Sequence, residues 1–390
     1  MAMMTSNRHN PVLFIDLKAQ RRRLGRRIEQ AIMKVVDRGE FILGSEIAEL
    51  EQRLAAIVGA RACITCASGT DALMLILTAR GVGPGDGVLV PAFAYPSVAE
   101  TVVLLGATPI FVDVLPDTFT LDPAGIAAGV AAARAARVAP RGVIAVDLFG
   151  HPADYRRILP AARAHELFVV CEGAHGFGAT LDGARVGTFG DATAISFFPT
   201  MPLGAYGDGG AVFTDDPIIE RLIRGLLAPE SGVERAEHAQ YDKAGRLDTL
   251  QAAVLLEKLS IFSEELSSRL QVAERYAAAL ADFIAVPTVA AGATSVWSHY
   301  TIKADDRDQL LTACRAWGLA TRICYPVPLN RLPPFHDCPV AGGKVPVAEE
   351  LSRKVLSLPM HPYLISTEQD RVIGALRTAF FQGPFEPHYG

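Results

Sequence analysis

The chain has 390 residues, of which 50% are hydrophobic and 20% are charged, so it can bury the core of two domains or of one large domain. Its net charge of −5 argues against a nucleic-acid surface, and the basic stretch at 21–27 is expected to be the solvated face of a helix. The N-terminus lacks the apolar core of a signal peptide, and no apolar run of about 18 residues predicts a membrane span. We therefore expect a cytoplasmic protein that binds neither nucleic acid nor membrane.

The N-terminal part is expected to be helical. Apolar residues recur at helical spacing over 17–37, which predicts an amphipathic helix, and a second helix is expected at 46–57. The next apolar run holds Cys63 and Cys66, two of six cysteines, in a C-x-x-C arrangement. No second C-x-x-C accompanies it, so we expect small core residues rather than a metal or redox pair, and no metal site.

From residue 62 onward, short apolar runs alternate with helical patterns. The predicted strands are 62–67, 87–91, 109–114, 142–149 and 167–172, and helices are expected through about 79, then at 96–105, 123–136 and 153–165. Such an alternation indicates an α/β fold with a parallel sheet covered on both faces. A long helical segment at 247–282 then leads into a smaller α/β domain. The predicted domains are 1–282 and 283–390.

The loops at the carboxyl ends of the strands are the expected ligand site, as in other open parallel sheets. In ASGTDAL (67–73), Ser68, Gly69 and Thr70 stand where a strand turns into a helix. Free N–H groups at a helix N-terminus attract an anion such as phosphate. The alternative is an ordinary helix cap by Ser68 or Thr70.

Two further loops carry aromatic and ionisable groups. PAFAYPSV (91–98) places Phe93 and Tyr95 near a strand end, where a ring packs in the core by default or stacks on a flat ligand. CEGAHGFGA (171–179) places Glu172 at a strand end and His175 three residues later. This pair could perform acid/base work, or it could be a satisfied structural pair.

The fourth loop is ISFFPTMPLGAYGDGGAV (195–212). Ser196 could donate to a phosphate, and the glycines at 207–210 permit a tight turn before the next strand. Its centre, Met201, has no acid, base, nucleophile or charge.

Together these loops resemble the sugar-nucleotide aminotransferases that use pyridoxal phosphate (PLP), a DegT/StrS-like family of PLP fold type I. The resemblance runs from FIDLKAQ (14–20) to LSLPMHPYL (356–364) and includes GEFILGSEIAELE, ASGTDAL, VGTFGDATAISFFPT, LGAYGDGGAVFTDD, GRLDTLQAA and YPVPL. The branch acting on UDP-linked 3-keto-hexuronic acids is the most similar in these motifs. The resemblance implies a large domain with a mostly parallel seven-stranded sheet, a smaller C-terminal α/β domain, and a homodimer with its active site at the interface.

The resemblance also implies roles for single residues. Gly69, Thr70 and Ser196 match positions that hold the cofactor phosphate, and Tyr95 matches the aromatic position that stacks on the pyridine ring. Met201 stands where the family has the lysine that forms the Schiff base with PLP and moves the proton. A thioether can do neither.

Other positions depart from the family pattern as well. Glu172 replaces the Asp that pairs with the pyridine nitrogen, and His175 replaces a Gln beside the cofactor. Ala244 stands where the family has an Asn that reaches the phosphate of the partner subunit's site. Asn330 stands where the family has the His of a P-L-H stretch. The family's Arg and His-Gly pattern is replaced around Leu227, Pro229 and Glu230.

Coordinated losses favour a natural relative that has left PLP chemistry over a single laboratory change at Met201. We therefore expect no bound cofactor, with PLP admitted only non-covalently, and a PLP-independent biosynthetic enzyme. It would act on a small carbonyl or sugar-like intermediate with Glu172 and His175 as its acid/base pair. The alternatives are a PLP-dependent sugar-nucleotide aminotransferase captured as an inactive Lys-to-Met variant, and a non-catalytic pseudoenzyme partner.

Overall fold

The structure is a computed structural model that describes residues 11–227 and 245–382. Its centre is a seven-stranded sheet in the order β1-β9-β8-β5-β4-β2-β3. Among these strands only β9 runs antiparallel to its neighbours. The strands are β1 (Ala62–Cys66), β2 (Asp86–Pro91), β3 (Thr108–Val112), β4 (Ala139–Val146), β5 (Phe168–Glu172), β8 (Ala192–Ser196) and β9 (Gly210–Thr214). The predicted seven-stranded, mostly parallel α/β sheet is confirmed.

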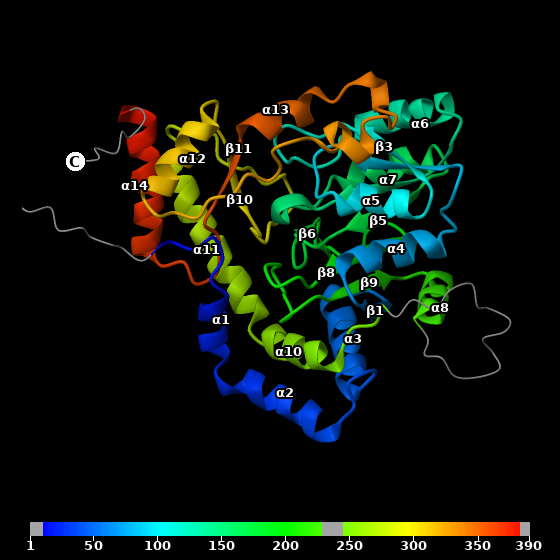
Figure 1. Ribbon diagram of the computed structural model, residues 1–390, viewed down its shortest axis with the longest axis horizontal. Coiled ribbons are helices and arrows are strands. Elements are labelled where there is room, and N and C mark those ends of the chain that lie inside the picture. The colour runs from blue at the N-terminus through cyan, green and yellow to red at the C-terminus, as the bar shows by residue number, and fades with distance from the viewer. Residues whose placement is uncertain (1–10, 228–244, 383–390) are drawn as a thin grey trace, which may run out of the picture.

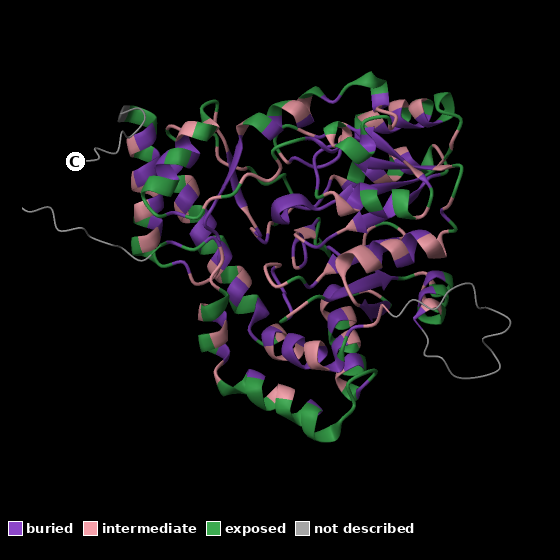
Figure 2. Cartoon of the chain, in the orientation of Figure 1, coloured by how far each residue is buried: buried purple, intermediate pink, exposed green. Residues whose placement is uncertain are grey.

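Helices cover both faces of this sheet (Figure 1). On one face α4, α5 and α8 pack against the strands, and on the other face α6 and α7 do so. Their bounds are α4 (Gly69–Ala79), α5 (Ser97–Leu104), α6 (Ile126–Ala135), α7 (Tyr155–Arg163) and α8 (Pro217–Leu226). Because both faces are covered, the strands are buried almost throughout, as Figure 2 shows.

The N-terminal and linking segments each contain a break that the sequence pattern did not predict. The helix expected at 17–37 is two helices, α1 (Leu17–Leu24) and α2 (Arg26–Arg38), because Gly25 adopts φ 59°. The helical segment expected at 247–282 is likewise α10 (Thr249–Leu259) followed by α11 (Phe262–Leu280). Apolar periodicity continues across each break, so only the backbone geometry reveals it.

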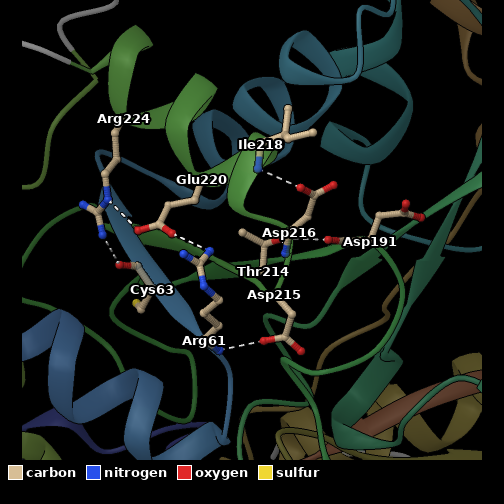
Figure 3. A network of polar contacts seen from close by, with 9 residues as sticks. All are labelled: Arg61, Cys63, Asp191, Thr214, Asp215, Asp216, Ile218, Glu220 and Arg224. Atoms are coloured by element: carbon tan, nitrogen blue, oxygen red, sulfur yellow. Dashed lines mark hydrogen bonds and ion pairs between the residues drawn. The ribbon is translucent and has the colours of Figure 1, made fainter.

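The helix α3 (Ser45–Val58) and the helix α8 flank the outer strand β1, where a charged network fixes α8 (Figure 3). Arg224 of α8 donates to the backbone oxygen of Cys63 at 3.2 Å, and Arg61 donates to Glu220 at 3.0 Å. Asp216 caps the helix by accepting the Ile218 N–H at 2.7 Å. The edge of the sheet is therefore held by side chains rather than by another strand.

The smaller C-terminal unit packs around the end of α11. It contains β10 (Tyr300–Lys303), α12 (Arg307–Ala316), β11 (Val355–Leu358) and α14 (Ser366–Gln382). The helix α13 (Pro346–Lys354) precedes β11 in the chain but packs Ala348 and Leu351 into the core of the large unit. The strands β10 and β11 pair antiparallel, and a short β6–β7 ribbon (Thr180–Leu181 and Ala184–Arg185) lies in the large unit. Val12 lies in the apolar core of the C-terminal unit, whereas Leu329 and Phe335 lie in the core of the large unit. The predicted boundary at 282/283 stays a prediction.

All six cysteines are free, and Cys63 and Cys66 are buried in the core, which confirms their predicted packing role. In the described part of the chain, no helix combines the length and the apolar character needed to cross a bilayer. The same residues contain no cluster of three or more His, Cys, Asp or Glu side chains arranged to hold a metal ion.

Candidate functional site

The N-terminus of α4 forms one wall of the candidate site. Ser68 has an extended backbone, and its hydroxyl accepts the Asp71 N–H at 3.0 Å, so the predicted helix cap is present. Gly69 and Thr70 are the first two residues of the helix. Because the first N–H groups of a helix have no partner within it, these two amides are suited to an anion.

Ser196 lies directly against this helix start. A Cβ built on Gly69 would lie 2.6 Å from the Cβ of Ser196 and 3.2 Å from its hydroxyl oxygen. Ser196 ends β8 opposite Gly210, and Gly210 also pairs with Cys66 at the end of β1. The structure therefore brings Gly69, Thr70 and Ser196 together.

Glu172 ends β5, the neighbour of β8, and is partly buried. Its Oε1 accepts the Ala174 N–H at 3.1 Å. Burial raises the pKa of Glu172 to about 7, against the smaller lowering effect of that hydrogen bond. The carboxyl group is thus poised near neutrality, and a cationic partner would favour its charged form.

His175 is held as a neutral ring. Its Nδ1 accepts the Phe149 N–H at 3.3 Å, so the neutral imidazole carries its proton on Nε2. Burial lowers the pKa of His175 to about 4. His175 can therefore donate a hydrogen bond from Nε2, but it is a weak base near neutral pH, and its proposed acid/base role with Glu172 stays a prediction.

The sequence did not single out two rings that the fold brings to this site. The His299 ring lies 4.8 Å from the His175 ring, centroid to centroid, and burial lowers the pKa of His299 well below its usual value. The Tyr325 ring lies 6.4 Å from the Tyr95 ring, centroid to centroid. Burial raises the pKa of Tyr325, and the nearby Cys324, Glu172 and Tyr95 raise it further. Both come from segments distant in sequence, and the YPVPL motif that contains Tyr325 gives no ligand signal by itself.

The two aromatic residues of the second loop have different environments. Phe93 is 1% exposed and packs in the core, whereas Tyr95 is 62% exposed. The default core interpretation is therefore correct for Phe93 and wrong for Tyr95, whose ring is open to a ligand or to another chain.

Met201 lies in the loop between β8 and β9 and is partly buried, and its N–H donates to the Phe198 oxygen at 2.9 Å. Its thioether offers no amine. Of the other departures, Leu227 is buried at the end of α8, and the side-chain oxygen of Asn330 is buried without a hydrogen-bond partner. Pro229, Glu230 and Ala244 lie outside the described residues.

These residues suit a phosphate-bearing, cationic ring. The Gly69 and Thr70 amides and the Ser196 hydroxyl can bind the phosphate, and Gly69 has no Cβ that would separate the helix start from Ser196. Glu172 supplies a carboxyl group whose charged form a protonated ring nitrogen would stabilise. Met201, in the loop that follows Ser196, carries no amine and cannot form an imine with such a cofactor.

Comparison with known proteins defines the family. Residues 22–377 match the model of the DegT/DnrJ/EryC1/StrS aminotransferase family. The chain is 42% identical over 366 residues to a UDP-2-acetamido-2-deoxy-3-oxo-D-glucuronate aminotransferase of Pseudomonas aeruginosa, which covers 93% of this chain and 99% of that protein. It is also 42% identical to a DegT DnrJ EryC1 StrS aminotransferase from Brucella abortus, with a TM-score of 0.91 over 95% of this chain and 99% of that one.

A third relative corrects the expectation about the cofactor. The crystal structure of NtdA from Bacillus subtilis contains bound cofactor PMP, the amine form of PLP. It is 26% identical, with a TM-score of 0.81 over 96% of this chain and 87% of that chain. The expectation of no bound cofactor is wrong, and the PLP-independent hypothesis loses its basis. This chain belongs to the DegT/DnrJ/EryC1/StrS aminotransferase family.

Proposed function

We propose that this chain is a PLP-binding form of a sugar-nucleotide aminotransferase that Met201 inactivates, because Met201 cannot attach the cofactor covalently. The observation that carries the proposal is the contact of Gly69 with Ser196 beside Glu172, because it assembles a phosphate cradle and a ring partner at one edge of the sheet. When bound, PLP stabilises the electron pair left by breaking a C–H bond next to an amine.

We propose the following roles for the chain's own residues, the role of Tyr95 resting on the family resemblance. The Gly69 and Thr70 amides and the Ser196 hydroxyl bind the phosphate, and the Glu172 carboxylate accepts the ring N–H. The exposed Tyr95 ring stacks on the cofactor. Met201 provides neither an attachment point nor a proton carrier, so this sequence is expected to be inactive in transamination.

The proposed substrate is a UDP-linked 3-keto sugar, with glutamate as amino donor. This proposal is supported by the 42% identity to the aminotransferase of Pseudomonas aeruginosa, which is named for a UDP-linked 3-oxo-glucuronate. The exposed Phe198 ring, 48% exposed in the loop that follows Ser196, supports a homodimer whose second subunit closes the site. We place the protein in the cytoplasm.

Substitution of Met201 tests the proposal. Met201→Lys is expected to take up PLP as a coloured complex that borohydride fixes to the protein, and to transfer the amino group of glutamate to the UDP-keto sugar. Met201→Leu is the matched control because it keeps an apolar side chain of similar size without an amine. Absence of PLP binding in both the parent and Met201→Lys would refute the cofactor proposal. A coloured but inactive Met201→Lys protein would refute the proposed substrate.

A further inference from the structure

Lys258 of α10 is a buried cation next to the loop that carries Met201. Lys258 is only 1% exposed. The Nζ donates to the backbone oxygen of Gly204 at 2.6 Å and lies 4.4 Å from the centroid of the Tyr206 ring. Among the described residues it has no ion pair within 4.0 Å. Fully buried lysines are rare without such a partner, so this placement needs a specific reason.

Gln251 binds the same loop from the same helix. Its Oε1 accepts the Tyr206 N–H at 2.9 Å. Gln251 and Lys258 are seven residues apart, about two helical turns, and therefore project from one face of α10. The helix thus holds two backbone groups of the loop, the Gly204 oxygen and the Tyr206 N–H.

The loop is folded tightly around these two points. The Ala205 N–H donates to the Phe197 oxygen at 2.7 Å, and the Phe197 N–H donates to the Gly209 oxygen at 2.7 Å. A Cβ on Gly204 would lie 2.5 Å from the Pro199 oxygen, so the chain passes close to itself there. That Cβ would also lie 2.8 Å from the Phe198 oxygen, which accepts the Met201 N–H at 2.9 Å. Holding the Gly204 carbonyl therefore restrains the turn that carries residue 201.

We propose that Lys258 and Gln251 are positioning residues that set the place of residue 201 in the cofactor site. This inference rests on the proposed function. An apolar residue at 258 would fill the space but leave the Gly204 oxygen without its donor, and an unpaired buried carbonyl would favour an altered loop. The competing explanation is a general contribution of Lys258 to the stability of the fold.

The test compares Lys258→Met and Gln251→Leu with the parent chain and with Val254→Ala. Val254 is a suitable control because it is buried on α10 but packs against Leu24 and Ile28 instead of the loop. Hydrogen exchange of a peptide covering 198–206 is measured without cofactor, and PLP affinity is measured by equilibrium dialysis. Thermal unfolding is followed in parallel.

Lys258→Met is expected to speed hydrogen exchange selectively in 198–206. It should also weaken PLP binding by about tenfold, because a loop that adopts its binding-competent conformation about a tenth of the time lowers the apparent affinity by that factor. Gln251→Leu is expected to act in the same direction. Val254→Ala should lower thermal stability with neither effect. Unchanged loop exchange and PLP affinity in Lys258→Met, or equal effects in Val254→Ala, would overturn the inference. The same measurements distinguish failure of the proposed function from failure of this inference. If the proposed function is wrong, the parent chain binds no PLP, and hydrogen exchange in 198–206 still shows whether Lys258 holds the loop.

Discussion

The start of α4 at Gly69 lies against Ser196 at the end of β8, with 2.6 Å between the Ser196 Cβ and a Cβ placed on Gly69. These residues are far apart in sequence, and their contact defines the proposed phosphate cradle. A side chain at position 69 cannot be accommodated without moving the start of α4 or the end of β8, where Ser196 is paired with Gly210.

Gly69→Ala is expected to separate α4 from β8. Overpacking of this kind costs about 1–3 kcal/mol of unfolding free energy. Displacement of the backbone amides at the start of α4 should also weaken PLP binding measurably. Chemical denaturation and equilibrium dialysis measure the two effects. Adding Ser196→Gly removes the clashing Cβ and should recover stability but not phosphate affinity. Full recovery of both would show that the Ser196 hydroxyl has no part in binding.

The cofactor-free protein should lose stability as the pH rises through neutrality because of Glu172. Its folded pKa of about 7 lies above its ordinary value of 4.5, so the folded state binds more protons between these two pH values. The contribution of Glu172 is therefore present at low pH and declines by roughly 3 kcal/mol as the pH rises from about 4.5 to above 7. Glu172→Gln should remove the Glu172 contribution and so make the decline in stability with pH less steep. Denaturation curves across the pH range measure it, and identical slopes in parent and variant would contradict the assignment.

Asp147 should behave as a buried, protonated acid. It follows β4 directly, and its Oδ1 accepts the Ala153 N–H and the Tyr155 hydroxyl, each at 2.7 Å, while Oδ2 is buried without a partner. Burial raises the pKa of Asp147 to about 8 from 3.8, so it favours folding less as the pH rises between these values.

Asp147→Asn is therefore expected to keep the parent's stability near pH 7 and to remove this pH dependence. Asp147→Ala should lose about 2–4 kcal/mol, because the Ala153 N–H and the Tyr155 hydroxyl are both left buried and unpaired. Thermal and denaturant unfolding distinguish the two variants. Equal losses in Asn and Ala would indicate that the charged carboxylate is the native form.

His175 should contribute through its Nε2–H, not through a positive charge. His175→Gln keeps a donor and is expected to retain PLP affinity, whereas His175→Phe keeps ring packing against Phe149 but loses the donor and should bind several-fold more weakly. Because the pKa of His175 is lowered to about 4, the parent's affinity should show no step from this residue between pH 5 and 8. An affinity step near pH 6.5 that disappears in His175→Gln would contradict this.

Several features of the fold and site could be predicted from the sequence because they depend on local patterns. Alternating apolar runs and helical periodicity indicated a covered parallel sheet, and the motifs around 67–73 and 195–212 indicated the loops of the site. The sequence also determined that residue 201 has no amine, since side-chain chemistry does not depend on folding. It did not reveal the breaks at Gly25 and at 260–261, because apolar periodicity continues through both.

The tertiary structure decided the properties that arise from surroundings. The pKa of Glu172 and the tautomer of His175 depend on burial and on partners contributed by other segments, and the exposure of Tyr95 depends on where its loop emerges from the core. Lys258 carries no functional signal in its own helix pattern, and its contact with Gly204 exists only once α10 packs beside the loop. Sequence thus determined which chemical groups the protein has. The fold determined which of them meet and in which protonation state, because desolvation and hydrogen bonding act between residues distant along the chain.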